Sequence, residues 1–218
     1  MPRALFEKTG NAVWTSHLDL MRLFQRAFKR AGLPLTHTQG FNPRPSVSIA
    51  LPLSVGVESL CELLDFDLDG MDVSCDEICF RLNEALVEGV RVRQVYEDGQ
   101  KIKHLALLRS VLTLEYDAGI PQGAVDAIRK LLSQNSLTVE KKGKNGIAQQ
   151  DIVPMLRSFE VAAENREVTI QLLACCQNPT LNPMQVGAAI EKYLPELKPD
   201  HALCRRIEIY DTNENVFR

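Results

Sequence analysis

The chain has 218 residues, of which 45% are hydrophobic and 24% charged, with a formal net charge of −3. This composition argues against a disordered chain, and no stretch reaches the roughly 18 apolar residues of a membrane span. We therefore expect a soluble cytoplasmic protein with no membrane partner.

The first half has an alternating pattern of strand and helix signals. Its periodicity predicts a strand at 3–14, a helix at 16–31, strands at 46–53 and 60–68, a helix at 74–86 and a strand at 90–97. Ser16 is expected to cap the first helix, while Gly32 and Pro34 are expected to end it. The predicted order is βαββαβ.

The second half repeats this order. It predicts a strand at 106–116, a helix at 121–134, a hairpin at 157–163 and 167–174, a helix at 183–194 and a strand at 203–210. An additional basic segment is expected at 137–156. The predicted fold class is α+β, with two tandem ferredoxin-like halves (1–100 and 101–218), antiparallel sheets and helices on one face of each.

The predicted helix at 16–31 places four cations on one side. At 100° per residue, Arg22, Arg26, Lys29 and Arg30 fall within about 100° of arc, opposite the apolar residues. Exposed charges are usual on the far side of a helix that packs on a core. Asp19 is the one acid on this side, however, so the cations are not a set of i,i+4 ion pairs and would suit phosphates.

The segment "THTQGFNPRP" that follows cannot be helical, because Pro43 and Pro45 impose extended or turn geometry. Gly40 permits an unusual backbone conformation, and Phe41 either fills the core or offers a flat face to a base. The candidate polar contacts come from His37, Gln39, Asn42 and Arg44.

Uneven charge extends beyond this segment. Residues 1–60 hold seven Lys and Arg against three Asp and Glu, whereas residues 61–98 hold three against eleven. The predicted insertion adds a second basic patch of Lys141, Lys142 and Lys144. Such local basic surfaces indicate a nucleic-acid partner in spite of the acidic total.

The six cysteines are expected to be reduced thiols, and their spacing matches no zinc pattern. Cys75 and Cys79 fall on the apolar side of a predicted helix, so we expect them to be core residues. The acidic row "DFDLDGMD" reads as a strand whose charged side faces solvent, because carboxylates two residues apart diverge on a strand. We therefore expect no metal and no cofactor.

Two stretches resemble a known bacterial family. The run "SHLDLMRLFQRAFKRAGLPLTHTQGFNPRPSVSIALPLSVGVES" is similar to the signature of radical-SAM-linked proteins of unknown function, and "KKGKNGIAQQDIVPML" resembles that family's basic stretch and Asp-Ile-x-Pro motif. The resemblance implies a radical SAM protein as partner. This chain is not itself the radical SAM catalyst, because "CDEIC" at 75–79 lacks the third cysteine of Cys-x3-Cys-x2-Cys.

Three functions remain open from the sequence. The first is an RNA-binding accessory protein that works on tRNA or rRNA with a separate radical SAM modifying enzyme. The second is an RNA-acting enzyme in which His17 and His37 form an acid–base pair with help from Arg44, although we do not expect catalysis by this chain alone. The third is a protein–protein adaptor that docks through residues 61–98. The sequence assigns no role to Glu58 and Ser59.

Overall fold

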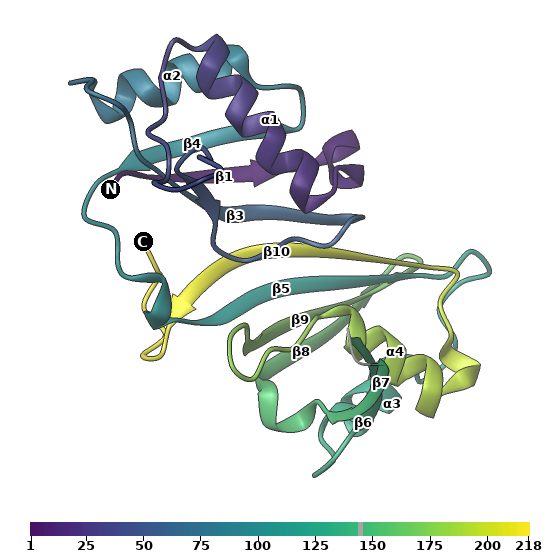
Figure 1. Ribbon diagram of the computed structural model, residues 1–218. Coiled ribbons are helices and arrows are strands. Elements are labelled where there is room, and N and C mark those ends of the chain that lie inside the picture. The colour runs from purple at the N-terminus through teal and green to yellow at the C-terminus, as the bar shows by residue number, and fades with distance from the viewer. Residues whose placement is uncertain (144–145) are drawn as a thin grey trace. The chain divides into compact units, whose positions relative to one another are not determined.

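The computed structural model describes residues 1–143 and 146–218, so Lys144 of the predicted second basic patch lies outside the described residues (Figure 1). The chain divides into two compact units, Met1–Ile102 together with Arg218, and Lys103–Phe217. Among the described helices, none has the length and apolar character needed to cross a bilayer.

The first unit is an antiparallel sheet with two helices on one face (Figure 1). Its strand order is β4-β1-β3, and β2 pairs with the outer edge of β3. This order, 4-1-3-2, is that of a ferredoxin-like sandwich. Its elements are β1 (Arg3–Lys8), the 3₁₀ turn η1 (Gly10–Trp14), α1 (His17–Arg30), β2 (Val47–Ile49), β3 (Val57–Phe66), α2 (Cys75–Ala85) and β4 (Val90–Tyr96).

The second unit has the same arrangement. Its strand order β10-β5-β9-β8 is again 4-1-3-2 when the four strands are numbered within the unit, so the predicted α+β class with two ferredoxin-like halves is confirmed. Its elements are η2 (Ile102–His104), β5 (Leu105–Glu115), α3 (Ala124–Leu132), β6 (Thr138–Gly143), β7 (Gly146–Asp151), η3 (Val153–Met155), β8 (Leu156–Glu164), β9 (Glu167–Cys175), α4 (Met184–Tyr193), η4 (Pro195–Leu197) and β10 (His201–Asp211).

Two strands are shorter than the sequence predicts. The strand expected over 3–14 ends at Lys8, because Gly10 has a φ of +54° and starts the 3₁₀ turn η1. The strand expected over 46–53 is reduced to Val47–Ile49. Pro52 lacks the backbone N–H that a longer pairing would need.

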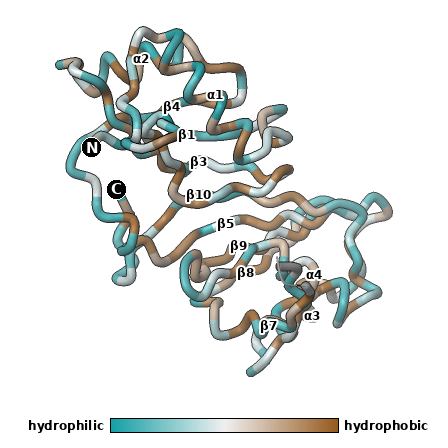
Figure 2. Tube along the Cα trace, viewed as in Figure 1, coloured by the Kyte–Doolittle hydropathy of each residue, from teal (hydrophilic) through white to brown (hydrophobic). Residues whose placement is uncertain are grey.

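Helix α1 is fixed by its cap and by its aromatic contacts. Ser16 accepts a hydrogen bond from the Asp19 backbone N–H at 3.2 Å, which confirms the predicted cap. Phe24 packs edge-on against Phe6 of β1 with ring centroids 4.7 Å apart, and Phe28 packs against Phe66 of β3 at 4.9 Å. One side of α1 is therefore held on the sheet. Figure 2 shows hydrophobic residues along the strands and helices and hydrophilic residues in most loops.

The basic insertion of the second unit is a β-hairpin, β6–β7, closed at its base by Asp151. The Asp151 carboxylate accepts the backbone N–H of Leu137 at 2.9 Å and that of Val153 at 3.1 Å. Ile152 beside it is fully buried. The Asp-Ile-x-Pro stretch is therefore a structural closure, in which a carboxylate joins the two ends of the insertion.

Replacing Asp151 with Ala is expected to destabilise the protein by about 1 kcal/mol at pH 7, because two N–H groups lose a partly solvated acceptor. The hydrogen bond from Leu137 N–H holds the pKa of this carboxyl below its ordinary value. A depressed pKa means that the stabilisation is present above the unfolded pKa and is lost as the pH falls through the folded pKa. Urea unfolding at pH 7 and at lower pH should therefore show the variant approaching the wild type in acid.

An Asp126→Ala variant is the control for this measurement. The Asp126 side chain is 89% exposed and lies 3.6 Å from the Arg129 guanidinium, a contact of little energetic value. Its stability should change little at either pH. An Asp151→Ala variant as stable as Asp126→Ala at pH 7 would contradict the closure.

Candidate nucleic-acid interface

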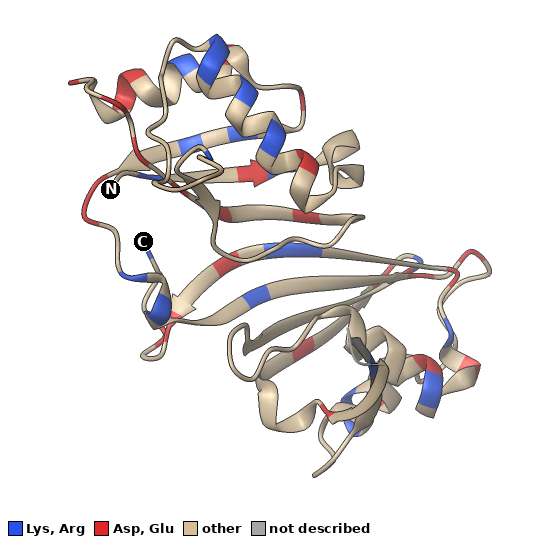
Figure 3. Cartoon of the chain, in the orientation of Figure 1, with Lys and Arg blue, Asp and Glu red and all other residues tan. Residues whose placement is uncertain are grey.

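The outward side of α1 carries a row of cations, which we call the cationic face. Arg22, Arg26, Lys29 and Arg30 are all exposed, whereas Leu20, Phe24, Ala27 and Phe28 are buried on the opposite side. Figure 3 shows Lys and Arg on successive turns of α1. The geometry of the helix thus separates one apolar side from one basic side.

Two of these cations have specific partners. The Arg22 guanidinium lies 3.0 Å from the Asp19 carboxylate. The Ser16 hydroxyl and Arg22 both donate to that carboxylate and lower the pKa of Asp19. Arg30 Nη2 donates to the Ala85 carbonyl oxygen at 2.6 Å and so caps the last turn of α2. Within the described part of the chain, Arg26 and Lys29 form no salt bridge or side-chain hydrogen bond.

The loop after α1 is a small ordered arch, which we call the signature loop (residues 36–45). Its base is tied to the end of β3, because Thr36 N–H donates to the Asp67 carbonyl oxygen at 3.0 Å and the Thr36 hydroxyl donates to the Asp67 carboxylate at 2.9 Å. Higher up, Thr38 N–H donates to the Arg44 carbonyl oxygen at 2.8 Å, and Arg44 N–H donates to the Thr38 hydroxyl at 3.1 Å. These bonds support a defined tip.

The tip of the signature loop presents its side chains to solvent. Phe41 is 106% exposed relative to a free residue, so it does not fill the core. Gly40 has a φ of +135°, a conformation in which glycine is favoured and which turns the chain at the tip. A fully exposed aromatic ring contributes little hydrophobic stabilisation, so the burial of apolar surface does not account for its position. The predicted contacts Gln39, Asn42 and Arg44 are exposed with it.

The two candidate catalytic histidines are not brought together. His17 begins α1, where its Nδ1 atom is buried and has no hydrogen-bond partner among the described residues. His37 is exposed in the signature loop, beyond the other end of the helix. Fourteen residues of α-helix separate the two positions by about 20 Å. This separation is too large for the acid–base pair that the sequence allows.

The remaining predicted residues lie elsewhere. Lys141, partly buried, pairs with Ala148 in the hairpin, and Lys142 pairs with Ile147 on the same two strands. Glu58 accepts a hydrogen bond from Gly10 N–H at 3.2 Å, and Ser59 is fully buried. Glu58 and Ser59 lie near the start of β3, whereas the signature loop is tied to the chain just after its end.

Acidic residues of the row after residue 61 stabilise the fold of the first unit. Asp65 forms a salt bridge with Arg3, whose side chain is only 6% exposed, and Asp67 anchors the signature loop. In residues 1–143 and 146–218, no cluster of three or more His, Cys, Asp or Glu side chains is placed to hold a metal ion. Burial raises the pKa of Cys176 to about 12 and that of Cys204 to about 11, so both are neutral thiols at neutral pH.

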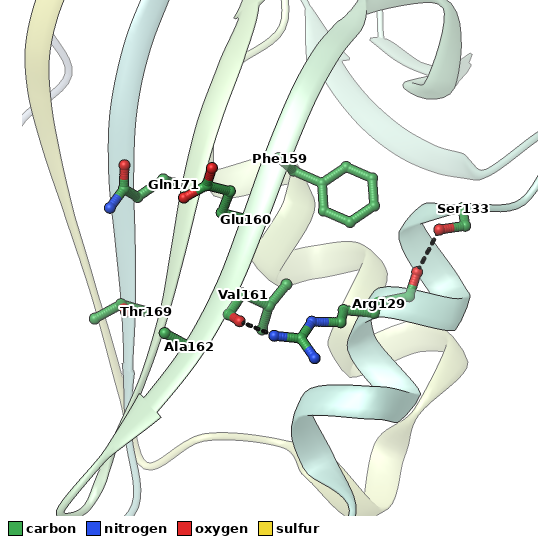
Figure 4. Close-up of a pocket in the computed structure, with 8 residues that line it drawn as sticks. All are labelled: Arg129, Ser133, Phe159, Glu160, Val161, Ala162, Thr169 and Gln171. Carbon is green, nitrogen blue, oxygen red and sulfur yellow. Dashed lines mark hydrogen bonds between the residues drawn. The ribbon is translucent and has the colours of Figure 1, made fainter.

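A hollow of about 410 Å³ in the second unit contains none of the predicted site residues (Figure 4). It runs along β8, the edge strand of its sheet, beside α3. Figure 4 shows Arg129 reaching from α3 to the Val161 carbonyl, to which Nη2 donates at 2.6 Å. The guanidinium thus occupies an edge acceptor that another strand would otherwise use, which protects the edge from unwanted pairing.

A smaller hollow in the first unit was not predicted from the sequence. It lies between the end of α1 and α2, has a volume of about 290 Å³ and includes Arg30 of the cationic face. Its aromatic residue, Phe80, is 64% exposed. The sequence did contain a signal for this hollow. Ile78 and Leu82 are the buried residues of α2, so Phe80 is an apolar side chain on the polar side of that helix.

Solved structures with a similar fold are distant in sequence. A chain of a Cbf5-Nop10-Gar1 complex aligns with a TM-score of 0.52 at 10% identity, covering 95% of this chain and 48% of its own length. A chain of the archaeal box H/ACA sRNP Nop10-Cbf5 complex aligns with a TM-score of 0.46, also at 10% identity, covering 94% and 46%. This chain therefore spans about half the length of either, and the likeness to the first concerns the fold alone.

A search of curated proteins gave no match. A family match, in contrast, extends over residues 2–183 and includes α1, the signature loop and the Asp151 closure. The chain therefore belongs to the bacterial family described as "uncharacterized protein conserved in bacteria (DUF2344)".

Proposed function

We propose that this protein binds structured tRNA or rRNA and presents it to a separate radical SAM enzyme. The observation that carries the proposal is the fully exposed Phe41 at the tip of a hydrogen-bonded loop, in the same unit as the cationic face. Sequence-tolerant RNA recognition combines aromatic stacking with cations that contact phosphates. Both parts are present on one small domain.

The cationic face and the signature loop have different roles in the proposed binding. The cations of α1 sit on a rigid helix, about 6 Å apart along the axis per four residues, and supply contacts that do not depend on base sequence. The signature loop supplies a flat ring, and Gln39, Asn42 and Arg44 supply hydrogen-bonding groups. Arg44 can contact a phosphate through two N–H groups or stack on a base.

The proposal includes a separate enzyme because the chain resembles radical-SAM-linked proteins but lacks the cysteine motif of a radical SAM catalyst. The resemblance to radical-SAM-linked proteins rests on the stretch that forms α1 and the signature loop, and the chain lacks the three-cysteine cluster motif. His17 and His37 lie at opposite ends of α1, so they do not form the predicted acid–base pair. The other candidate groups of the first unit are suited to binding. The second unit adds Lys141 on its hairpin as a further contact to phosphate.

The test is fluorescence anisotropy with labelled tRNA and rRNA fragments, comparing the wild type with Phe41→Ala. Stacking on one aromatic ring is worth about 1–3 kcal/mol, so the variant should bind at least about fivefold more weakly. Because Phe41 is fully exposed, the free energy of unfolding should not change. Leu18→Ala, which removes another exposed apolar side chain from the same unit, should bind as the wild type does.

The result that contradicts the proposal is an absence of RNA binding by the wild type at low ionic strength. In that case the surface would serve a protein partner, as in the adaptor hypothesis. Equal losses in Phe41→Ala and Leu18→Ala would contradict the specific role of the signature loop.

A further inference from the structure

The hollow between α1 and α2 joins the cationic face to an exposed aromatic ring. Its lining comes from the last turn of α1 and from the outer side of α2. The residues that line it are Arg30, Ala31, Phe80, Arg81, Glu84 and Ala85. Its volume of about 290 Å³ is at the lower end of ordinary ligand sites and is enough for a small planar group.

Phe80 does not contribute its ring to the core. The side chain is 64% exposed, whereas Ile78 and Leu82 on the same helix are 2% and 0% exposed. The buried cluster of the first unit includes Ile78 and Leu82 but not Phe80. An aromatic face on the wall of a hollow, with cations beside it, is the surface on which an unpaired base stacks.

Arg30 connects this hollow to the cationic face. Its guanidinium has five N–H donors and uses Nη2 for the Ala85 carbonyl, so the exposed side chain keeps other donors for a ligand. The charge of Arg81 is largely offset by Glu77, whose carboxylate lies 2.6 Å from Arg81 Nε. Within residues 1–143 and 146–218, Arg30 is therefore the cation of the hollow that is not paired with a carboxylate, and it follows Arg26 along the helix.

We propose that this hollow receives one unpaired RNA nucleobase, which stacks on Phe80 while its phosphate contacts Arg30. The proposal rests on the RNA-binding function above and adds a single-stranded site to it. Glu84 is exposed at the rim and accepts hydrogen bonds from an amino group, so bases that carry one are preferred. A base inside a duplex is covered on both faces by its neighbours and cannot enter.

The experiment compares Phe80→Ala with the wild type on two probes, a single-stranded RNA oligonucleotide and a perfect duplex that contains the same strand. Anisotropy should show about a tenfold loss for the single strand and no loss for the duplex. The salt dependence should stay the same, because no charge is removed. Val87→Ala, an exposed apolar residue just after α2, is the matched control and should change neither probe.

A second variant reports stacking directly. Phe80→Trp in a Trp14→Phe background places the chain's single tryptophan in the hollow. Its fluorescence should be quenched by the single strand and should be unaffected by the duplex. This variant preserves an aromatic ring, so it should also keep the affinity that Phe80→Ala loses.

The outcomes separate this inference from the proposed function. If Phe41→Ala weakens binding while Phe80→Ala does not, the hollow is not a base site and the proposed function stands. Equal losses on single strand and duplex, or no quenching in Phe80→Trp, would also overturn the inference. If the wild type binds tRNA and rRNA fragments but not the single strand, the inference fails and the proposed function stands. If it binds none of these RNAs, the proposed function itself fails.

Discussion

An Arg22→Glu/Arg26→Glu/Lys29→Glu variant is expected to lose at least about a hundredfold in RNA affinity near 100 mM salt. Three favourable phosphate contacts become three repulsive ones, and fewer counterions are released on binding. The slope of log K against log salt should flatten by about 2 to 3, since each lost phosphate contact contributes about 0.7 for a single strand and about 0.9 for a duplex. Anisotropy across a salt series measures both quantities.

Arg30 is left unchanged in this variant because it also caps α2 through the Ala85 carbonyl. Losing that contact would confuse a binding defect with a folding defect. The matched control is Lys130→Glu/Arg166→Glu/Lys198→Glu, which changes the net charge equally at exposed positions of the second unit. Equal losses in the two triple variants would show that total charge matters and that the cationic face has no special role.

Gly89→Ala is expected to cost about 3 kcal/mol or more of folding free energy. A Cβ at this position would lie 2.5 Å from the Thr9 carbonyl oxygen and 2.9 Å from the Ala12 Cβ. The residue also has a φ of +83°, which alone costs about 1–2 kcal/mol for an L-residue. The carbonyl of Gly89 accepts a hydrogen bond from Thr9 N–H at 2.8 Å, so the turn cannot move away without losing that bond.

Gly56→Ala separates the steric clash of an added Cβ from the backbone strain of a positive φ. Its φ of +82° gives the same backbone strain, but a Cβ there would meet only the Trp14 ring, at an ordinary contact distance of 3.6 Å. Urea unfolding should show a loss of about 1–2 kcal/mol for Gly56→Ala and a clearly larger loss for Gly89→Ala, with unchanged m-values. Similar losses in both would contradict the steric explanation.

The fold was predictable from the sequence because its local signals agree with one another. Ser16, the alternating strands and the repeated βαββαβ order all point to ferredoxin-like halves. The error at residues 9–14 arose because apolar residues continue past Lys8, while Gly10 starts a 3₁₀ turn. Periodicity cannot distinguish the two without the backbone angle.

The candidate site was only partly predictable, for a different reason. The cationic face follows from helical geometry within one segment, so the sequence was sufficient to place it. The acceptor of Arg30 lies 55 residues away on α2, and the exposure of Phe80 depends on how α2 packs. The contact of Arg30 leaves no local pattern in the sequence. The position of Phe80 on the polar side of α2 is a local signal, but it does not reveal the hollow beside the ring. Phe41 remained ambiguous, since core filling and solvent exposure are equally compatible with an isolated aromatic residue in a loop.

Because Arg30 donates a hydrogen bond to the Ala85 carbonyl, the end of α2 competes with any ligand for the Arg30 guanidinium. A phosphate that draws the guanidinium away exposes an unpaired carbonyl and lets the last turn fray, whereas one that approaches the remaining N–H groups adds a bond without breaking another. The first mode is penalised and the second is not. The approach direction of a bound strand is thus selected by the folding of the helix that receives it, and hydrogen exchange at the end of α2 would slow on binding rather than accelerate.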